Sequence, residues 1–382
     1  MALSIIARSI EDRVNRRSIV RRKNQGWVPK IIAYAGYGST QSANVLARAV
    51  MKNPNDSTNH FTVPYLPRNA HSFTEAAVQE LSNYAREMGK YAQRGWRQFF
   101  VTEVGFLPVT VRLGKREIYT RTDRAGYIDL HVSGHGLEPG WHKAVIIPAV
   151  GQPVTAPVMI VSPDATHGLI SDIDDTILVT WLPRATLAAW NSFVLNTNAR
   201  SAVPGMSEFY QHLLHSETDA PVFYLSTGAW NTYSAMSRFI NANGLPFGPL
   251  LLTDWGPTAT RAFRSGPEHK KTQLRNLLIM FPNIKWYLVG DDGQHDLVIY
   301  DDLAREHPSR VRGIAIRQLN PVEQVLSHGT TESNPAARAD SDIERHGVPI
   351  IRGKDGFALL HESTRAFRRQ RGKTAHPQWE NQ

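Results

Sequence analysis

The chain contains no cysteine among its 382 residues. Disulfide bonds, thiol nucleophiles and cysteine-ligated metals are therefore excluded, and the absence fits a reducing compartment. Long hydrophobic runs are also missing, because no stretch approaches the roughly 18 apolar residues that a membrane helix needs. The first residues have no basic segment followed by a long apolar one, so we expect no secretory signal.

The net positive charge of the chain is concentrated at its two ends. Of the formal net charge of +9, residues 1–30 carry +6 and residues 365–382 carry +4, so the part between them is close to neutral. Nearly helical spacing of apolar residues among the N-terminal arginines predicts an amphipathic helix that can rest on a membrane. A solvated helix packed lightly on the protein is the alternative, and nucleic acid is a third option that no recognition motif supports. We expect an anionic membrane surface as partner of the basic termini, no nucleic acid, and a cytoplasmic location, peripheral on the inner face of the membrane.

Two domains are predicted between a basic N-terminal segment, residues 1–26, and a basic disordered tail, residues 365–382. Residues 27–160 are β-rich, and their short strands at close intervals predict a sandwich-like domain with one helical insertion at about 72–94. The glycine-rich segment 35–40 lacks the GxGxxG pattern and a P-loop lysine, which favours a tight turn over a phosphate site. The strands are expected at 28–34, 45–50, 99–104, 109–113, 117–121, 127–132 and 143–147.

A proline-rich stretch at 148–163 marks the boundary to a second domain, residues 161–364, in which strands alternate with helices. Such alternation predicts an α/β fold with a parallel sheet covered by helices. A polar loop is expected at 328–341. Strands are expected before residue 172 and at 222–226, 284–290, 311–316 and 348–351, and helices near 206–214, 232–242 and 269–280.

An apolar approach through Leu169 and Ile170 ends in three carboxylates, Asp172, Asp174 and Asp175. Adjacent like charges are costly to bury, and a divalent cation with oxygen ligands, such as Mg²⁺, is the natural compensation. Side chains two residues apart leave an extended backbone on the same face, so Asp172 and Asp174 can act together on one substrate, one of them as a nucleophile. A solvated acidic turn remains the alternative for this stretch alone.

Polar side chains also follow two later strands. Ser226 ends the strand after Asp172, Asp291 and Asp292 end the next, and Lys270 lies near the start of the helix between them. Because ligands of open α/β sheets bind beyond the carboxyl ends of the strands, we expect these groups to meet in one site.

The order of these groups resembles the haloacid-dehalogenase-like phosphatase superfamily, and more narrowly the actin-patch-type phosphatidate phosphatase family in its bacterial two-domain form. The resemblance rests on SDIDDTI at 171–177, FYLS at 223–226, NGLP at 243–246, GPLLL at 248–252, HK at 269–270 and LVGDDGQHD at 288–296. It implies a Rossmann-like parallel sheet as the catalytic domain, preceded by the β-sandwich-like domain.

The same resemblance implies the residue roles. Asp172 would be the nucleophile and a Mg²⁺ ligand, and Asp174 the general acid and base with its backbone carbonyl on the metal. Ser226 would hold a phosphoryl oxygen and Lys270 would neutralise developing charge. Asp291 would complete the metal site, supported by Asp292 and Asp296.

The function expected from these roles is a Mg²⁺-dependent phosphatidate phosphatase that forms an aspartyl-phosphate. One alternative is a phosphatase for a soluble or protein-borne phosphomonoester, because specificity would lie in loops such as 181–203. The other is a catalytically silent scaffold that binds membranes.

Overall fold

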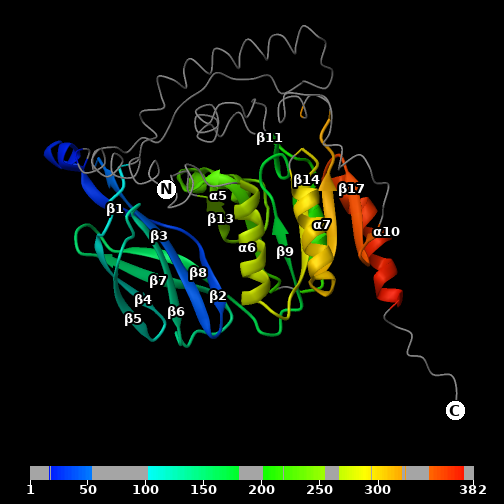
Figure 1. Ribbon diagram of the computed structural model, residues 1–382, viewed down its shortest axis with the longest axis horizontal. Coiled ribbons are helices and arrows are strands. Elements are labelled where there is room, and N and C mark those ends of the chain that lie inside the picture. The colour runs from blue at the N-terminus through cyan, green and yellow to red at the C-terminus, as the bar shows by residue number, and fades with distance from the viewer. Residues whose placement is uncertain are drawn as a thin grey trace, which may run out of the picture.

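The protein is described by a computed structural model in which two sheets lie side by side (Figure 1). The residues that the structure describes are 17, 19–53, 102–179, 201–217, 219–253, 266–293, 295–320, 323 and 344–373.

The first sheet is formed by eight strands in the order β1-β3-β2-β8-β7-β4-β5, with β6 paired to β3. All pairs are antiparallel except β2 with β8. The described part of this region is thus rich in β-strands, which are joined by hydrogen bonds into one sheet. The strands are β1 Val28–Ala33, β2 Gly36–Ser39, β3 Ser42–Lys52, β4 Pro108–Leu113, β5 Arg116–Arg121, β6 Tyr127–Ser133, β7 Gly140–Pro148 and β8 Val154–Val161.

Two segments of this sheet differ from the prediction. The glycine-rich stretch expected as a turn is strand β2, and its glycines permit close approach to β3, because a Cβ on Gly36 would lie 2.2 Å from the carbonyl oxygen of Asn44. Strand β8 runs through the proline-rich stretch expected as a domain boundary and lies between β2 and β7 in the sheet, and most of its apolar side chains are buried in the adjoining cores. Prolines argue against a strand in a sequence-based prediction. The residues around Pro157 nevertheless form a strand, because their apolar side chains are buried in it.

The second sheet has seven strands in the order β13-β12-β9-β14-β15-β17-β16, all parallel except β16. This confirms the predicted α/β class, although β13, β16 and helix α7 were not predicted. The strands are β9 His167–Ser171, β12 Val222–Ala229, β13 Leu250–Thr253, β14 Lys285–Asp291, β15 Val311–Arg317, β16 Glu344–Arg345 and β17 Val348–Gly353. A short separate pair, β10 Leu178–Val179 with β11 Ser201–Ala202, follows β9.

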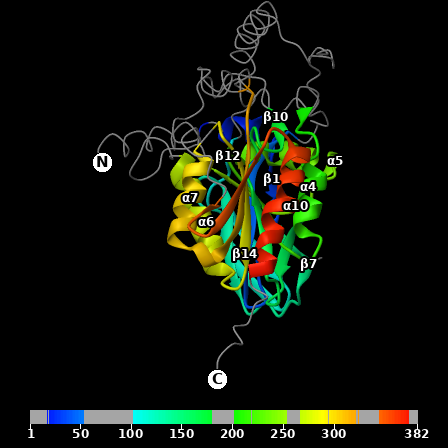
Figure 2. The same cartoon turned by 90° about the vertical axis from the view of Figure 1, so that its right-hand side faces the viewer.

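Helices cover both faces of this sheet (Figure 2). Helices α6 (Gly266–Met280) and α7 (Asp296–Glu306) pack on one face, where Leu274 and Leu303 meet Ile170 in one apolar core. Helices α4 (Met206–Leu214), α5 (Tyr233–Ala242) and α10 (Gly356–Lys373) contribute to the core on the other face. Strands buried on both faces explain the nearly continuous apolar runs of the sequence.

The chain order changes direction at β9. Strands β12 and β13 lie on one side of β9, whereas β14, β15 and β17 lie on the other. The carboxyl ends of β9, β12 and β14 therefore meet where the chain order reverses, which is where this type of sheet binds ligands.

The two sheets share a core. Tyr37 of β2 packs edge to face on Phe223 of β12, with 5.1 Å between the ring centroids, and Met159 and Val161 of β8 join the same cluster. The β-rich region is thus packed directly against the α/β region.

Several predictions concern residues outside the described part of the chain: the N-terminal amphipathic helix before residue 17, the helical insertion near 72–94, and the loops at 181–200 and 328–341. At the other end, α10 continues to Lys373, so the chain is helical beyond residue 365, where the disordered tail was expected. No helix among the described residues is long and apolar enough to cross a membrane.

Candidate active site

The first acidic motif forms a tight loop at the end of β9. The N–H of Asp172 still donates to the Val289 carbonyl of β14 at 2.8 Å, so this residue is held as part of the sheet. The chain then turns through Asp175, whose φ of 58° lies in the left-handed region that aspartate tolerates better than most residues. The turn closes with a bond of 3.0 Å from the Ile177 N–H to the Ile173 carbonyl. The loop buries Asp172, Asp174 and Asp175 together.

Lys270 joins this loop to the third strand end. Its ammonium group donates to Asp172 Oδ1 at 2.6 Å and to Asp296 Oδ1 at 2.5 Å, and its side chain is almost fully buried. A lysine near the N-terminus of a helix is unfavourable for the helix dipole, and burial removes its hydration. The two aspartates compensate for both costs, which is typical of a functional position.

The electrostatics of the pair follow from burial and from the charges in contact. Burial disfavours the charged form of Lys270, but Asp172 and Asp296 outweigh it and raise the lysine pKa. Burial raises the pKa of Asp172 to about 8; the negative charges of Asp296 and Asp174 act in the same direction, and Lys270 opposes them. Asp172 therefore gains its charge most easily when a further cation is bound.

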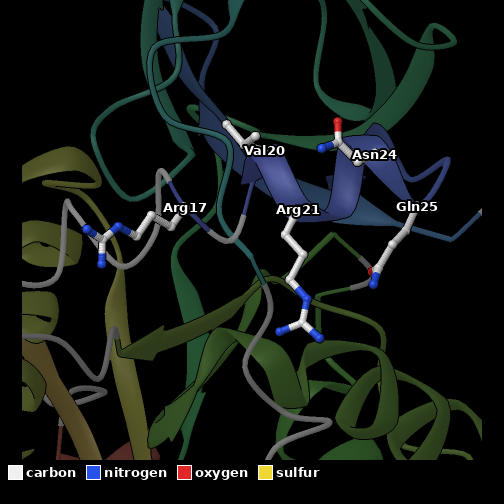
Figure 3. A pocket seen from close by; sticks show the side chains of 5 residues that line it. All are labelled: Arg17, Val20, Arg21, Asn24 and Gln25. Carbon is white, nitrogen blue, oxygen red and sulfur yellow. The ribbon is translucent and has the colours of Figure 1, made fainter.

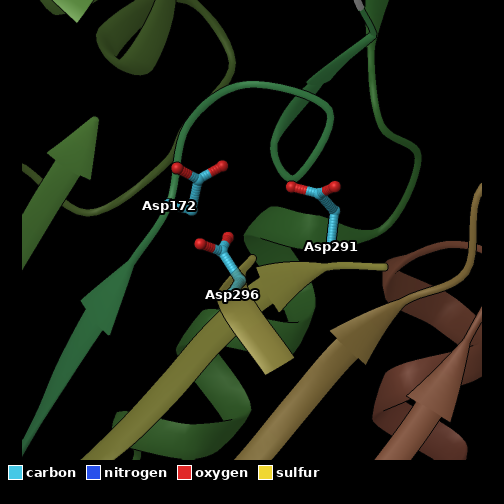
Figure 4. Close-up of side chains that lie close together, drawn as sticks. All are labelled: Asp172, Asp291 and Asp296. Carbon is cyan, nitrogen blue, oxygen red and sulfur yellow. The ribbon is translucent and has the colours of Figure 1, made fainter. Parts of the chain in front are cut away.

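Three carboxylates converge on one point between β9, β14 and α7 (Figure 4). Asp172, Asp291 and Asp296 each bring an oxygen within 4.8 Å of the other two, and all three are buried. Asp291 ends β14 and accepts the N–H of Gly293 at 2.7 Å, whereas Asp296 begins α7, where a negative charge suits the helix dipole. Gly290 makes room for this approach, because a Cβ there would lie 2.6 Å from Asp296 Oδ2.

The donor set fits a magnesium ion. Among the described residues, Asp296 Oδ2 is buried and has no hydrogen-bond partner, although it lies in the carboxylate cluster. The lysine charge balances one of the three carboxylates and leaves two negative charges, which a divalent cation would neutralise. Carboxylate oxygens are the ligands that Mg²⁺ prefers. The residues able to hold such an ion are Asp172, Asp291 and Asp296.

Asp174 and Ser226 form the other side of the site. The Ser226 hydroxyl donates to Asp174 Oδ2 at 2.9 Å, and the Gly228 N–H donates to the Ser226 oxygen at 2.9 Å. Within the acidic loop, the Thr176 hydroxyl donates to Asp172 Oδ2 at 3.1 Å. A carboxylate bonded to a hydroxyl is suited to exchange a proton with a bound ester oxygen.

The structure brings most of the predicted residues together and turns one away. Asp172, Asp174, Ser226, Lys270 and Asp291 gather at the three strand ends, and Asp296 contacts Lys270 directly. Asp292 lies outside the carboxylate cluster, because its side chain accepts the Leu319 N–H at 2.9 Å. Its backbone explains this direction, since successive residues of a strand point to opposite faces.

A buried ion pair behind the loop was not predicted. Arg317 at the end of β15 donates to the Asp175 carbonyl at 2.7 Å and to Glu323 Oε1 at 2.6 Å. It therefore fixes the backbone of the acidic loop from the side opposite the carboxylates. An arginine directly after the predicted strand 311–316 was the available signal, because a charge at a strand end beside an acidic motif is a candidate partner.

A separate hollow of about 600 Å³ lies beside the helical turns that precede β1 (Figure 3). It shares no residue with the carboxylate cluster, so it does not belong to the candidate active site. The lining residues are Arg17, Val20, Arg21, Asn24 and Gln25.

Part of the chain is similar in sequence to known proteins. Residues 167–318 match the family described as phosphatidate phosphatase APP1, catalytic domain, and this range contains Asp172, Asp174, Ser226, Lys270, Asp291 and Asp296. The chain is 32% identical over 176 residues to phosphatidate phosphatase APP1 of Saccharomyces cerevisiae, which is 46% of this chain and 30% of the yeast protein. Residues 167–318 belong to this family.

A second relative of the APP1-type domain is an uncharacterized protein of Schizosaccharomyces pombe, 26% identical over 168 residues, which is 44% of this chain and 27% of that protein. The matches thus span less than a third of either relative. Among solved structures, a carbohydrate acetylesterase of Xanthomonas citri aligns with 70% of this chain and 69% of its own at 10% identity, with a TM-score of 0.24, too low to bear on the fold.

Proposed function

We propose that the chain is a Mg²⁺-dependent phosphatidate phosphatase that converts phosphatidate to diacylglycerol and phosphate. The observation that carries the proposal is the Lys270 bridge between Asp172 and Asp296 within a buried carboxylate cluster, in a domain of the APP1 family. Phosphoryl transfer requires positioning and neutralisation of charge, and this arrangement offers both.

In the proposed mechanism, an oxygen of Asp172 attacks phosphorus in line with the glycerol oxygen, and the bond from phosphorus to that oxygen breaks. Asp174 gives a proton to the leaving oxygen, and then takes one from the water that hydrolyses the aspartyl-phosphate. Ser226 donates to a phosphoryl oxygen, and Lys270 neutralises charge on the transferring group. These roles agree with the contacts of Asp174 with Ser226 and of Asp172 with Lys270.

The residues that would hold Mg²⁺ are Asp172, Asp291 and Asp296, with Asp174 adding its backbone carbonyl. A bound Mg²⁺ supplies charge stabilisation to the phosphoryl oxygens. In the same proposal the catalytic domain, about 161–364, has the haloacid-dehalogenase-like architecture, and residues 27–160 form a sandwich-like domain that precedes it. The parallel sheet and its switch of chain order at β9 support the first part.

The proposed partner besides the substrate is an anionic membrane surface, and the proposed location is the cytoplasmic face of a membrane. The helical residues before β1 carry the exposed side chains of Arg17, Arg21 and Lys23 next to Val20, which is 59% exposed. In Figure 1 they lie at the upper end of the molecule, on the side to which the β9 arrow points. A surface that binds anionic lipid there would present the strand ends to the membrane.

The test is release of phosphate from phosphatidate in mixed micelles with Mg²⁺, with the wild type beside Asp172→Asn. We expect release by the wild type and loss of about four orders of magnitude in the variant, since a nucleophile has no substitute in this site. Asp302→Asn serves as the matched control, because Asp302 pairs with Lys271 at the surface of α7.

Soluble esters separate the alternatives. Activity on aryl or sugar phosphates without activity on phosphatidate would contradict the substrate and favour a soluble phosphomonoester. Activity of Asp172→Asn equal to that of the wild type would contradict the mechanism. Absence of activity on every ester, with retained binding to lipid vesicles, would favour the scaffold.

A further inference from the structure

The strand segment that carries Ser226 is an irregular part of β12, where the register to β13 shifts. The pairing of β12 with β9 ends at Tyr224. Its pairing with β13 includes Leu225 and then Ala229, and the register shifts between these two residues. Residues 226–228 therefore have no strand partner on either side in these ladders. Contacts made beyond the strand can therefore contribute to the position of the Ser226 hydroxyl.

Those contacts come from the first sheet. Strand β12 continues directly into the short helix η3 (Trp230–Thr232) and then into α5. The ring of Trp230 stacks on Tyr34, with 4.5 Å between centroids and 29° between planes, and Tyr233 lies 4.7 Å from Tyr34. The Ala35 N–H donates to the Tyr233 hydroxyl at 2.8 Å. We call Tyr34, Trp230 and Tyr233 the aromatic bridge.

The first sheet offers this bridge a rigid support. Tyr34 is 2% exposed, and its N–H donates to the Leu46 carbonyl of β3 at 3.0 Å. Trp230 also lies near Tyr127 of β6, with 6.4 Å between the ring centroids. The guanidinium carbon of Arg48 lies over the Tyr127 ring, 4.3 Å from its centroid. Packed aromatic pairs add specific geometry to the apolar area that they bury.

We propose that the aromatic bridge positions Ser226, so that the first sheet is part of the catalytic unit. The inference deepens the proposed function and rests on it for the role of Ser226. Tyr34, Trp230 and Tyr233 are positioning residues, because they fix the chain directly after residues 226–228. The hydrogen bond to Asp174 fixes the Ser226 side chain itself.

A second aromatic contact between the two regions gives a matched control. Trp141 of β7 packs on Phe247 at 4.7 Å, and both rings are partly exposed. This pair joins the same two parts of the protein but lies on the segment after α5 and contacts no residue next to Ser226. Trp141→Ala thus removes an aromatic contact of the same kind without touching the bridge.

The experiment measures phosphate release by the full chain, from phosphatidate micelles and from p-nitrophenyl phosphate, for Trp230→Ala, Tyr233→Phe and Trp141→Ala. We expect Trp230→Ala to lose about tenfold or more in kcat/KM on both substrates, the magnitude of one displaced hydrogen-bond donor. Tyr233→Phe, which removes only the acceptor of the Ala35 N–H, is expected to lose less, and Trp141→Ala nothing.

Non-additivity separates positioning from general stability. In a Ser226→Ala background, Trp230→Ala is expected to cost less than about twofold, because residues that act through one group are not additive. Additive losses, or equal losses in Trp230→Ala and Trp141→Ala, would overturn the proposal.

Hydrogen exchange tests the bridge without activity. The Gly228 N–H bonded to Ser226 is the reporter, and we expect the peptide that contains residues 226–229 to exchange faster in Trp230→Ala but not in Trp141→Ala. If the wild type hydrolysed no ester while exchange changed in this way, the proposed function would fail and the bridge would stand. Unchanged exchange in both variants would sink the bridge whatever the activity.

Discussion

At the scale of single residues, the buried charge of Asp172 links metal binding to stability. Its pKa is raised from 3.8 to about 8 by burial, so the folded protein without metal binds a proton that the unfolded chain releases. Stability therefore decreases as the pH rises from about 4 to about 8. We expect the thermal midpoint in chelator to be lower at pH 8 than at pH 5 by on the order of a few degrees.

Asp172 also determines how the stabilisation of the protein by Mg²⁺ depends on pH. Mg²⁺ binds the ionised carboxylate, so it should stabilise the wild type more at pH 8 than at pH 5. Asp172→Asn should weaken the dependence of the thermal midpoint on pH and its dependence on Mg²⁺. In chelator at pH 8 the thermal midpoint of this variant should be higher than that of the wild type, because one buried charge is removed. A flat pH profile for the wild type in chelator would contradict this account of the site.

At the scale of elements, the approach of α7 to the end of β14 depends on one glycine. A Cβ on Gly290 would lie 2.6 Å from Asp296 Oδ2 and 2.9 Å from Tyr300 Cε2, so Gly290→Ala must move the start of α7. Since Asp296 contacts Lys270 and belongs to the carboxylate cluster, we expect loss of about tenfold in activity and weaker Mg²⁺ dependence.

The matched variant is Gly134→Ala. Gly134 has a φ of 66° and no atom within 4 Å of an added Cβ, so the change introduces backbone strain far from the carboxylates. It should lower the thermal midpoint and leave activity and Mg²⁺ dependence unchanged. Equal activities of the two variants would show that the Gly290 contact has no catalytic consequence.

The elements also show what the sequence can predict. Strands β9, β12 and β14 were found because both of their faces are buried, and Asp172, Ser226 and Asp291 follow from the rule that strand ends meet. Which of two neighbouring aspartates faces the site depends on side-chain direction past the strand end, and Asp292 turned out to point to Leu319. The contact between Lys270 and Asp296 depends on how α6 packs on α7, which no local pattern contains.

At the scale of the whole molecule, the two sheets behave as one packed unit. Tyr37 and Phe223 share a core, and Ala35 donates to Tyr233 across the same contact. Sequence patterns predicted two domains because each has its own rhythm of strands. The contact between them joins side chains that are distant in the chain, so it could not be predicted from that rhythm.

Charge is distributed over the molecule in a way that predicts how it meets a membrane. The helical turns before β1, which carry Arg21 and Lys23, lie at the upper left of the molecule, on the side to which the β9 arrow points (Figure 1). The body of the chain is close to neutral. Each basic residue near an anionic surface contributes about 1 kcal/mol, so reversing Arg17 and Arg21 to Glu should weaken binding to phosphatidylserine-containing vesicles by at least about thirtyfold. Reversing Arg116 and Arg121, exposed on β5 in the first sheet, makes the same change of net charge and should have little effect.

Sedimentation with vesicles measures this difference, and activity separates docking from chemistry. The Arg17 and Arg21 variant should lose activity on phosphatidate in vesicles and keep it on p-nitrophenyl phosphate, because its carboxylate cluster is intact. Added salt should reduce binding of the wild type and of the β5 variant alike, since exposed charges are screened within about 10 Å at 0.1 M. Equal binding of both variants would mean that net charge, and not the position of the basic segment, draws the protein to lipid.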